Sequence, residues 1–297
     1  MIDATLKGTI TAIVTPFKND LSIDFDAFEK LVNFQIDSGI EGIVVCGSTG
    51  ESATLSSKEK LSLIIKAVEI ANGRTAIIAG TGSNDTAASI DMTLLAKESG
   101  ADGVLLVAPY YNKPSQEGLF NHYLAISEAV DIPQIIYNVP GRAGINISAE
   151  TQLKIAENCK NVIATKEASG DLEQMAEIMK YAPEGFVLFC GDDALALPSV
   201  SIGSSGVISV ISNYVPKEFG DLIRLALSGN FLQAKELHYK LLDLMQINFI
   251  ESNPVPAKAI LNLMGKLENN VRLPLTPITA VSMKKIKTAL LNVGIIK

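Results

Sequence analysis

The stretch GIVVCGSTGESATLSSKEKLSLIIKAVEIANGRTAIIAG, residues 42–80, contains the repeating unit of this chain. Its ends, Gly42–Gly47 and Thr75–Gly80, are short apolar runs rich in β-branched residues, and such runs predict buried strands. Between them, residues 58–72 have the apolar spacing of an amphipathic helix. The segment Ser56–Glu59 has the Ser-x-x-Glu spacing of a capping box, which marks the start of that helix. The stretch therefore predicts a strand–helix–strand unit.

The same alternation recurs along the first 227 residues. The predicted strands are Gly8–Val14, Gly42–Gly47, Thr75–Gly80, Gly103–Ala108, Gln134–Val139, Val162–Ala168, Phe186–Gly191 and Gly206–Val210. The predicted helices are residues 26–38, 58–72, 86–99, 116–129, 149–158, 172–181, 194–201 and 217–227. Continuously apolar strands that alternate with helices indicate a parallel sheet covered on both faces.

Eight successive units favour an α/β fold of the (β/α)8 type, a TIM barrel, over an open sheet. A doubly wound sheet is the alternative, but its Gly-x-Gly-x-x-Gly turn after the first strand is missing. A barrel uses roughly 250 residues, and the chain has 297. From about residue 228 only helical patterns remain. We therefore expect a catalytic barrel over residues 1–227 and a small C-terminal helical appendage over residues 228–297.

Composition excludes several classes of function. Lys and Arg total 25 against 32 Asp and Glu, giving a net charge of −7, and no basic stripe is present. A nucleic-acid partner is therefore not expected. No apolar run approaches the roughly 20 residues that span a membrane, and the start lacks the pattern of a signal peptide. We expect no membrane partner and a cytoplasmic location.

The cysteines and histidines do not form a recognisable catalytic or metal-binding set. Cys46, Cys159 and Cys190 are odd in number and widely spaced, so we expect small buried side chains rather than disulfides or metal ligands. His122 and His238 lie in helical stretches away from any motif, which argues against a zinc hydrolase or a Ser-His-Asp enzyme. No metal or cofactor is expected.

Barrel enzymes place their reacting groups at the C-terminal ends of the strands. In Val162–Ala168, strand alternation puts Lys166 on the same face as Val162 and Ala164. An apolar interior favours the neutral amine of a lysine, and that amine is the nucleophile that forms a Schiff base with a carbonyl. The alternative is a structural lysine paired with Glu167.

Three further strand ends carry polar groups that suit such chemistry. Tyr137 ends the fifth strand, where a phenol beside the amine can transfer protons, although a strand tyrosine can equally be part of the core. The loop Gly47–Glu51 follows the second strand and can form a nest for an oxyanion, or be an ordinary turn. Arg142 suits bidentate binding of a carboxylate, or is a solvated loop arginine. Together with Lys166 these groups predict one pocket for a small 2-oxo acid.

With these motifs the chain resembles the dihydrodipicolinate synthases, a branch of the N-acetylneuraminate lyase family of class I aldolases. The resemblance runs nearly end to end. It includes Thr15–Phe17, Gly47–Glu51, Pro109–Pro114, Tyr137–Pro140, Lys166–Ala168, Gly191–Asp193 and Asn253–Pro256. The glycine loop and the Tyr…Lys pair are common to the whole family. Arg142 and the Asn-Pro-Val-Pro segment resemble the synthase branch.

The resemblance implies a lyase that condenses pyruvate with L-aspartate 4-semialdehyde in the diaminopimelate route to lysine, and a homotetramer. It implies that Lys166 forms the imine and that Ser48, Tyr137 and Tyr111 relay protons, with Tyr111 reaching in from a neighbouring subunit. It also implies that Thr49, with backbone groups of Gly191 and Ile208, binds pyruvate, and that Arg142 binds the carboxylate of the semialdehyde.

Two alternatives to the synthase remain. One is a retro-aldol lyase acting on N-acetylneuraminate or another 2-oxo sugar acid, since Ser48 is common in that branch. The other is a non-catalytic protein that binds 2-oxo acids. Feedback-sensitive synthases resemble a pattern with His at the positions of Ser57 and Lys60 and Glu at Ala88. Although Asn84 and Tyr110 match that pattern, the departures predict weak or absent inhibition by L-lysine.

Overall fold

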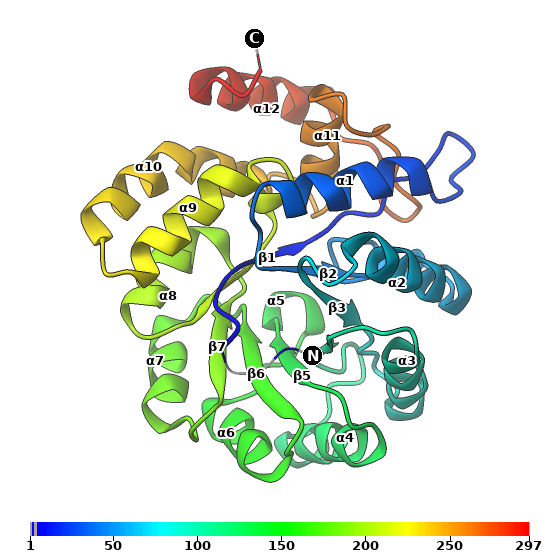
Figure 1. Ribbon diagram of the computed structural model, residues 1–297, viewed down its shortest axis with the longest axis vertical. Helices are drawn as coiled ribbons and strands as arrows, with labels where there is room; N and C mark the ends of the chain where they lie inside the picture. Colours follow the sequence, from blue (N-terminus) through cyan, green and yellow to red (C-terminus); the bar gives the residue numbers. More distant parts are fainter. Residues whose placement is uncertain (1, 3–4, 297) are drawn as a thin grey trace.

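Eight parallel strands close into one barrel in the computed structural model, which describes residue 2 and residues 5–296 (Figure 1). The strands are β1 Gly8–Ala12, β2 Gly42–Val45, β3 Ala76–Gly80, β4 Gly103–Val107, β5 Gln134–Asn138, β6 Val162–Glu167, β7 Val187–Cys190 and β8 Gly206–Ser209. β8 pairs with β1 through Gly8 and Gly206, which closes the barrel. The predicted (β/α)8 fold is confirmed.

Helices follow the strands around the outside of the barrel. They are α1 Phe25–Asp37, α2 Ser57–Ala71, α3 Thr86–Glu98, α4 Gln116–Ala129, α6 Ala149–Asn158, α7 Leu172–Tyr181, α8 Ala196–Ser201 and α9 Pro216–Leu227. The sequence did not predict three short turns that lie between strand ends and the following helices, which are η1 Ser52–Thr54, α5 Pro140–Ala143 and η3 Ile211–Asn213. A fourth turn, η2 Asp193–Leu195, forms the start of the predicted helix over residues 194–201.

The capping box predicted before α2 is present. The Ser56 hydroxyl accepts from the Glu59 backbone N–H at 3.3 Å, and the Glu59 carboxylate accepts from the Ser56 backbone N–H at 2.8 Å. This reciprocal pair satisfies N–H groups at the helix start. It fixes where α2 begins, and therefore where the loop after β2 ends.

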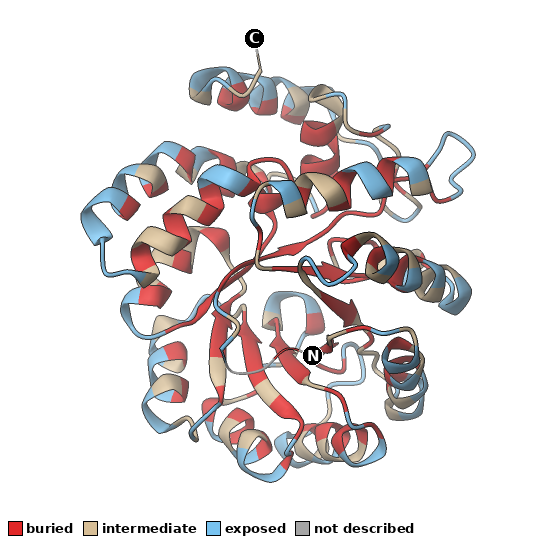
Figure 2. Ribbon diagram, viewed as in Figure 1, coloured by how far each residue is buried: buried red, intermediate tan, exposed pale blue. Residues whose placement is uncertain are grey.

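The strands separate two apolar layers. Figure 2 shows the strands almost wholly buried. The inner layer fills the barrel with Ile10, Ala12, Val44, Ile78, Leu105, Ile135, Tyr137, Val139, Ala164, Phe189 and Ile208. The outer layer packs the strands against the helices. Because side chains alternate along a strand, Lys166 shares the inner face with Ala164, while Thr165 and Glu167 face the helices.

Three helices follow the last barrel helix. α10 Phe231–Ile247 packs against α9, and α12 Ala280–Val293 packs against α10 and α11 Val255–Leu263. α11 also contacts η3, at the end of the barrel where the strands terminate. Figure 1 shows α12 at the edge of the molecule, beyond α1. Within residues 2 and 5–296, no helix has the length and apolar character needed to cross a membrane.

Candidate active site

Seven of the eight candidate residues lie at or beyond the carboxyl ends of five strands, and Ile208 lies within β8. Ser48 and Thr49 follow β2, and Tyr111 follows β4. The others are Tyr137 on β5, Arg142 on α5 after β5, Lys166 on β6, Gly191 after β7 and Ile208 on β8. Because the strands are parallel and close into a barrel, these ends lie at one mouth of it.

Lys166 points into the barrel mouth. Lys166 is only 5% exposed. It lies in register between Tyr137 on β5 and Phe189 on β7. The ammonium nitrogen is 4.2 Å from the centroid of the Tyr137 ring. Pairing with Glu167, the structural alternative, does not occur, because Glu167 is on the opposite face of the strand and is bound by amide groups there.

The neighbours of Lys166 leave room beside its side chain. A Cβ at Gly191 would lie 3.1 Å from Cε of Lys166 and 2.5 Å from Cβ of Ala168, so any side chain at this position would crowd the amine. Tyr137 and Ile208 belong to the inner layer that fills the barrel. The structure therefore brings Lys166, Tyr137 and Gly191 together and places Ile208 in the same barrel interior.

The loop Gly47–Glu51 is tightly turned and well anchored. The hydroxyl of Thr15 donates to the carbonyl of Gly50 at 2.7 Å. Thr49 is buried, and its hydroxyl accepts from the Asn253 side chain at 2.9 Å. Ser48 is half-buried in the same loop. The loop thus presents hydroxyls and backbone N–H groups at the barrel mouth, as an anion nest requires.

Arg142 lies on the one-turn helix α5 rather than in an irregular loop, because α5 forms directly after β5 with Pro140 as its first residue. Its guanidinium donates to the backbone carbonyl of Asn253 at 3.3 Å. The side chain of Asn253 contacts Thr49, so this one residue links the arginine to the loop. The sequence had marked Asn253 only as part of a motif, without assigning it contacts.

Tyr111 does not join the other candidates within one chain. Its side chain is 88% exposed, and its backbone has a left-handed φ of +74°. It approaches the site only through its backbone N–H, which donates to the carbonyl of Ala143 on α5 at 3.4 Å. In this chain Tyr111 therefore lies largely in solvent.

Sequence reasoning missed two buried charged groups next to this mouth. Asp193 accepts from the backbone N–H groups of Val210 (3.1 Å) and Ile211 (2.8 Å), and burial raises its pKa to about 6. Lys258 forms a buried ion pair with Glu51 at 2.6 Å, and burial lowers its pKa against the opposing effect of that carboxylate. A lone lysine in the apolar run of α11 was the signal for the second group.

The cysteines are structural, as expected. Cys46, Cys159 and Cys190 are all free and buried. Burial raises the pKa of the Cys46 thiol, which directly precedes the glycine loop, to about 12. A thiol with so high a pKa is not a nucleophile at neutral pH, so Lys166 has no competitor from this residue.

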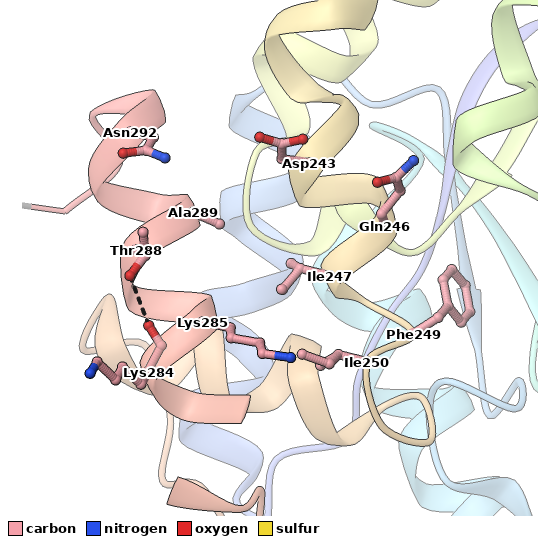
Figure 3. Close-up of a pocket in the computed structure, with 10 residues that line it drawn as sticks. All are labelled: Asp243, Gln246, Ile247, Phe249, Ile250, Lys284, Lys285, Thr288, Ala289 and Asn292. Carbon is pink, nitrogen blue, oxygen red and sulfur yellow. Dashed lines mark hydrogen bonds between the residues drawn. The ribbon is translucent and has the colours of Figure 1, made fainter. Parts of the chain in front are cut away.

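A groove of about 560 Å³ lies elsewhere, between α10 and α12 (Figure 3). Its ten lining residues include Asp243, Ile247, Phe249 and Lys285, and none of the candidate residues. It is open to solvent, and none of its lining residues belongs to the loops at the carboxyl ends of the strands. The convergence of buried polar groups at the barrel mouth makes that mouth the better candidate.

Comparisons with known proteins identify the family of this chain. The sequence model described as the dihydrodipicolinate synthetase family matches residues 5–292. A 4-hydroxy-tetrahydrodipicolinate synthase from Endomicrobium trichonymphae is 48% identical over 98% of this chain and 99% of its own. The dihydrodipicolinate synthase from Aquifex aeolicus superposes with a TM-score of 0.96 at 44% identity, covering 97% of this chain and 98% of that one.

A chloride-inhibited dihydrodipicolinate synthase from Acinetobacter baumannii, solved in complex with pyruvate, gives a TM-score of 0.96 at 42% identity. It covers 98% of this chain and 100% of that one. The match extends over the barrel and the C-terminal helices alike. The chain belongs to the dihydrodipicolinate synthetase family.

Proposed function

We propose that Lys166 forms a Schiff base with pyruvate and that this imine is the intermediate of the reaction. The enzyme is a lyase of the class I aldolase type, a 4-hydroxy-tetrahydrodipicolinate synthase. It condenses pyruvate with L-aspartate 4-semialdehyde in the diaminopimelate pathway of lysine biosynthesis. The observation that carries the proposal is the buried amine of Lys166, held in register beside Tyr137 inside the barrel mouth.

The first half of the reaction forms the imine. The neutral amine of Lys166 attacks C2 of pyruvate, and the carbinolamine then loses water. A proton must reach the departing oxygen and another must leave the nitrogen, and the Tyr137 hydroxyl is the group beside the amine that can exchange both. The loop Gly47–Glu51 binds the pyruvate carboxylate through its N–H groups and the Thr49 hydroxyl. Backbone groups of Gly191 and Ile208 line the same space.

The second half makes the carbon–carbon bond. Loss of a proton from C3 converts the imine to an enamine, and C3 attacks the aldehyde carbon of the semialdehyde. The alkoxide formed takes a proton from the hydroxyl relay of Ser48, Tyr137 and Tyr111. The amino group of the second substrate then attacks C2, which closes the ring and releases Lys166. One water leaves for each pair of substrates condensed.

Arg142 supports the synthase over a sugar-acid lyase. Its guanidinium has one hydrogen bond within the described chain, to Asn253, so its other N–H groups are available for a second carboxylate. A sugar-acid lyase needs groups that bind hydroxyls at this place. The test is a turnover assay of the purified protein with pyruvate and L-aspartate 4-semialdehyde, and separately with N-acetylneuraminate. Turnover of N-acetylneuraminate alone would contradict the proposal, and turnover of neither would favour a binding protein.

The assembly is a homotetramer, a dimer of dimers, in which Tyr111 acts in the site of a neighbouring subunit. The exposure of Tyr111 in a single chain supports this. Mixing Tyr111→Phe subunits with Lys166→Ala subunits tests it, because some sites in the mixed oligomer then combine an intact tyrosine with an intact lysine. We expect activity to recover on mixing. No recovery, together with the sedimentation coefficient of a monomer, would contradict the proposed assembly. A cytoplasmic location stays a prediction.

A further inference from the structure

The ion pair between Lys258 and Glu51 lies fully inside the protein. The two side chains are 0% and 1% exposed, whereas the pair between Lys217 and Asp221, for example, is largely in solvent. Removing two charges from water is costly, and a buried pair is therefore weak evidence for stability alone. Its position is more informative, because it joins α11 of the C-terminal helical region to the last residue of the glycine loop.

Glu51 needs an anchor because of its backbone. Its φ is +55°, and Cys46, immediately before the loop, has a φ of +59°. Residues with a Cβ adopt this left-handed conformation only where the surroundings hold them there. The Glu51 carboxylate is held from two sides, by Nζ of Lys258 at 2.6 Å and by the backbone N–H of Arg272 at 3.1 Å.

The same C-terminal segment contacts the loop a second time. Asn253, just before α11, donates to the hydroxyl of Thr49. Lys258 and Arg272 also lie over the ring of Phe17, at 4.2 and 4.4 Å from its centroid. The loop is thus fixed at Thr49 and at Glu51 by residues that lie more than 200 positions further along the chain.

We propose that Lys258 is a positioning residue for pyruvate, acting through Glu51. It holds the loop so that the N–H groups and hydroxyls of Ser48 and Thr49 converge on the substrate carboxylate. Its ammonium also neutralises the Glu51 carboxylate, which would otherwise repel an anion bound in the adjacent nest. The C-terminal helical region is then a working part of the site. This inference rests on the proposed function of the loop as the pyruvate site.

The test compares Lys258→Met with Lys266→Met. Lys266 is a matched control, since it also lies in the C-terminal region with its ammonium over an aromatic ring, that of Phe34 at 3.6 Å, but contacts no loop of the site. For each variant the measurements are the pyruvate concentration that gives half-maximal borohydride trapping, and the KM for each substrate. In Lys258→Met, the pyruvate half-saturation is expected to rise at least about tenfold, with the semialdehyde KM much less changed. Lys266→Met should match the wild type.

Equal losses for both substrates, or a pyruvate half-saturation equal to that of the wild type, would overturn the inference. If Lys258→Met does not fold, the double variant Glu51→Gln/Lys258→Met takes its place, because it leaves no buried charge without a partner. The pyruvate half-saturation is expected to rise in the double variant too. If it equals that of the wild type, or if the double variant does not fold, the pair has a purely structural role. Absence of trapping in the wild type would instead refute the proposed function itself.

Discussion

Replacing Glu167 tests the hydrogen bonds that hold β5 and β6 in place beside Lys166. Its carboxylate is fully buried, and no Lys or Arg pairs with it in the described part of the chain. It accepts five hydrogen bonds instead: two from Asn138 at 3.0 Å, and one each from Gln152 at 2.7 Å, Gln174 at 3.0 Å and the backbone of Ser169 at 2.9 Å. Each carboxylate oxygen takes at least two of these bonds.

The replacement Glu167→Gln keeps the shape but turns one acceptor oxygen into a donor. At least two hydrogen bonds to a charged acceptor are then lost, at about 1.5–3 kcal/mol each. The lower end applies, because an amide costs less to bury than a carboxylate. We therefore expect the free energy of unfolding to fall by about 3 kcal/mol.

Activity should fall as well, because Glu167 pairs in register with Asn138, one residue beyond the pairing of Lys166 with Tyr137. Loss of the bond between them loosens β5 against β6. A misplacement of about 1 Å between reacting groups costs on the order of 100-fold in rate, and kcat is expected to fall by that order.

The assay is urea unfolding of both proteins, followed by steady-state turnover under conditions where each is folded. The matched control is Glu157→Gln, which removes an exposed carboxylate from α6, the helix that carries Gln152. The control should match the wild type in both measurements. A Glu167→Gln protein within about 1 kcal/mol of wild-type stability, with unchanged kcat, would show that these hydrogen bonds do not hold the site in place.

Three further predictions follow from single groups. Tyr137→Phe keeps the ring beside the amine but removes its hydroxyl, so kcat should fall by roughly 10²–10³-fold, and an unchanged kcat in the turnover assay would exclude the phenol from proton transfer. Burial lowers the pKa of His122 to about 4, so the folded state resists a proton that the unfolded chain accepts below about pH 6.5. That stability is present at neutral pH, and about 3 kcal/mol of it is lost as the pH falls from about 6.5 towards 4. Urea unfolding at about pH 7 and about pH 4.5 should therefore show a smaller loss of stability in His122→Gln than in the wild type. An equal loss in the two proteins would contradict the assignment. Because Ala88 cannot pair with an ammonium and Lys60 adds a like charge, L-lysine is expected to inhibit weakly or not at all, and a sub-millimolar inhibition constant in the turnover assay would contradict this.

Local patterns were sufficient to predict the framework. The observed strands end within two residues of their predicted ends, because buried parallel strands are continuous apolar runs bounded by turns. Strand alternation alone predicted that Lys166 lies on the same face as Ala164, which is part of the inner layer. The short turns after the strands, such as α5 at Arg142, were missed because single turns leave no periodic signal.

Contacts between distant segments were beyond the reach of such patterns. Lys258 and Glu51 are 207 residues apart, and nothing in the spacing of either indicates the other. Sequence proximity was even misleading for Glu167, whose adjacency to Lys166 suggested an ion pair that a strand geometrically forbids. Its true partners come from α6 and α7, which only the closed barrel brings to that position.

The most direct measurement of the mechanism is mass spectrometry of the protein after incubation with pyruvate and borohydride. We expect one pyruvate-derived mass increase per chain, mapped to Lys166, and neither adduct nor turnover in Lys166→Ala. An adduct on any other lysine, or undiminished turnover by Lys166→Ala, would contradict it.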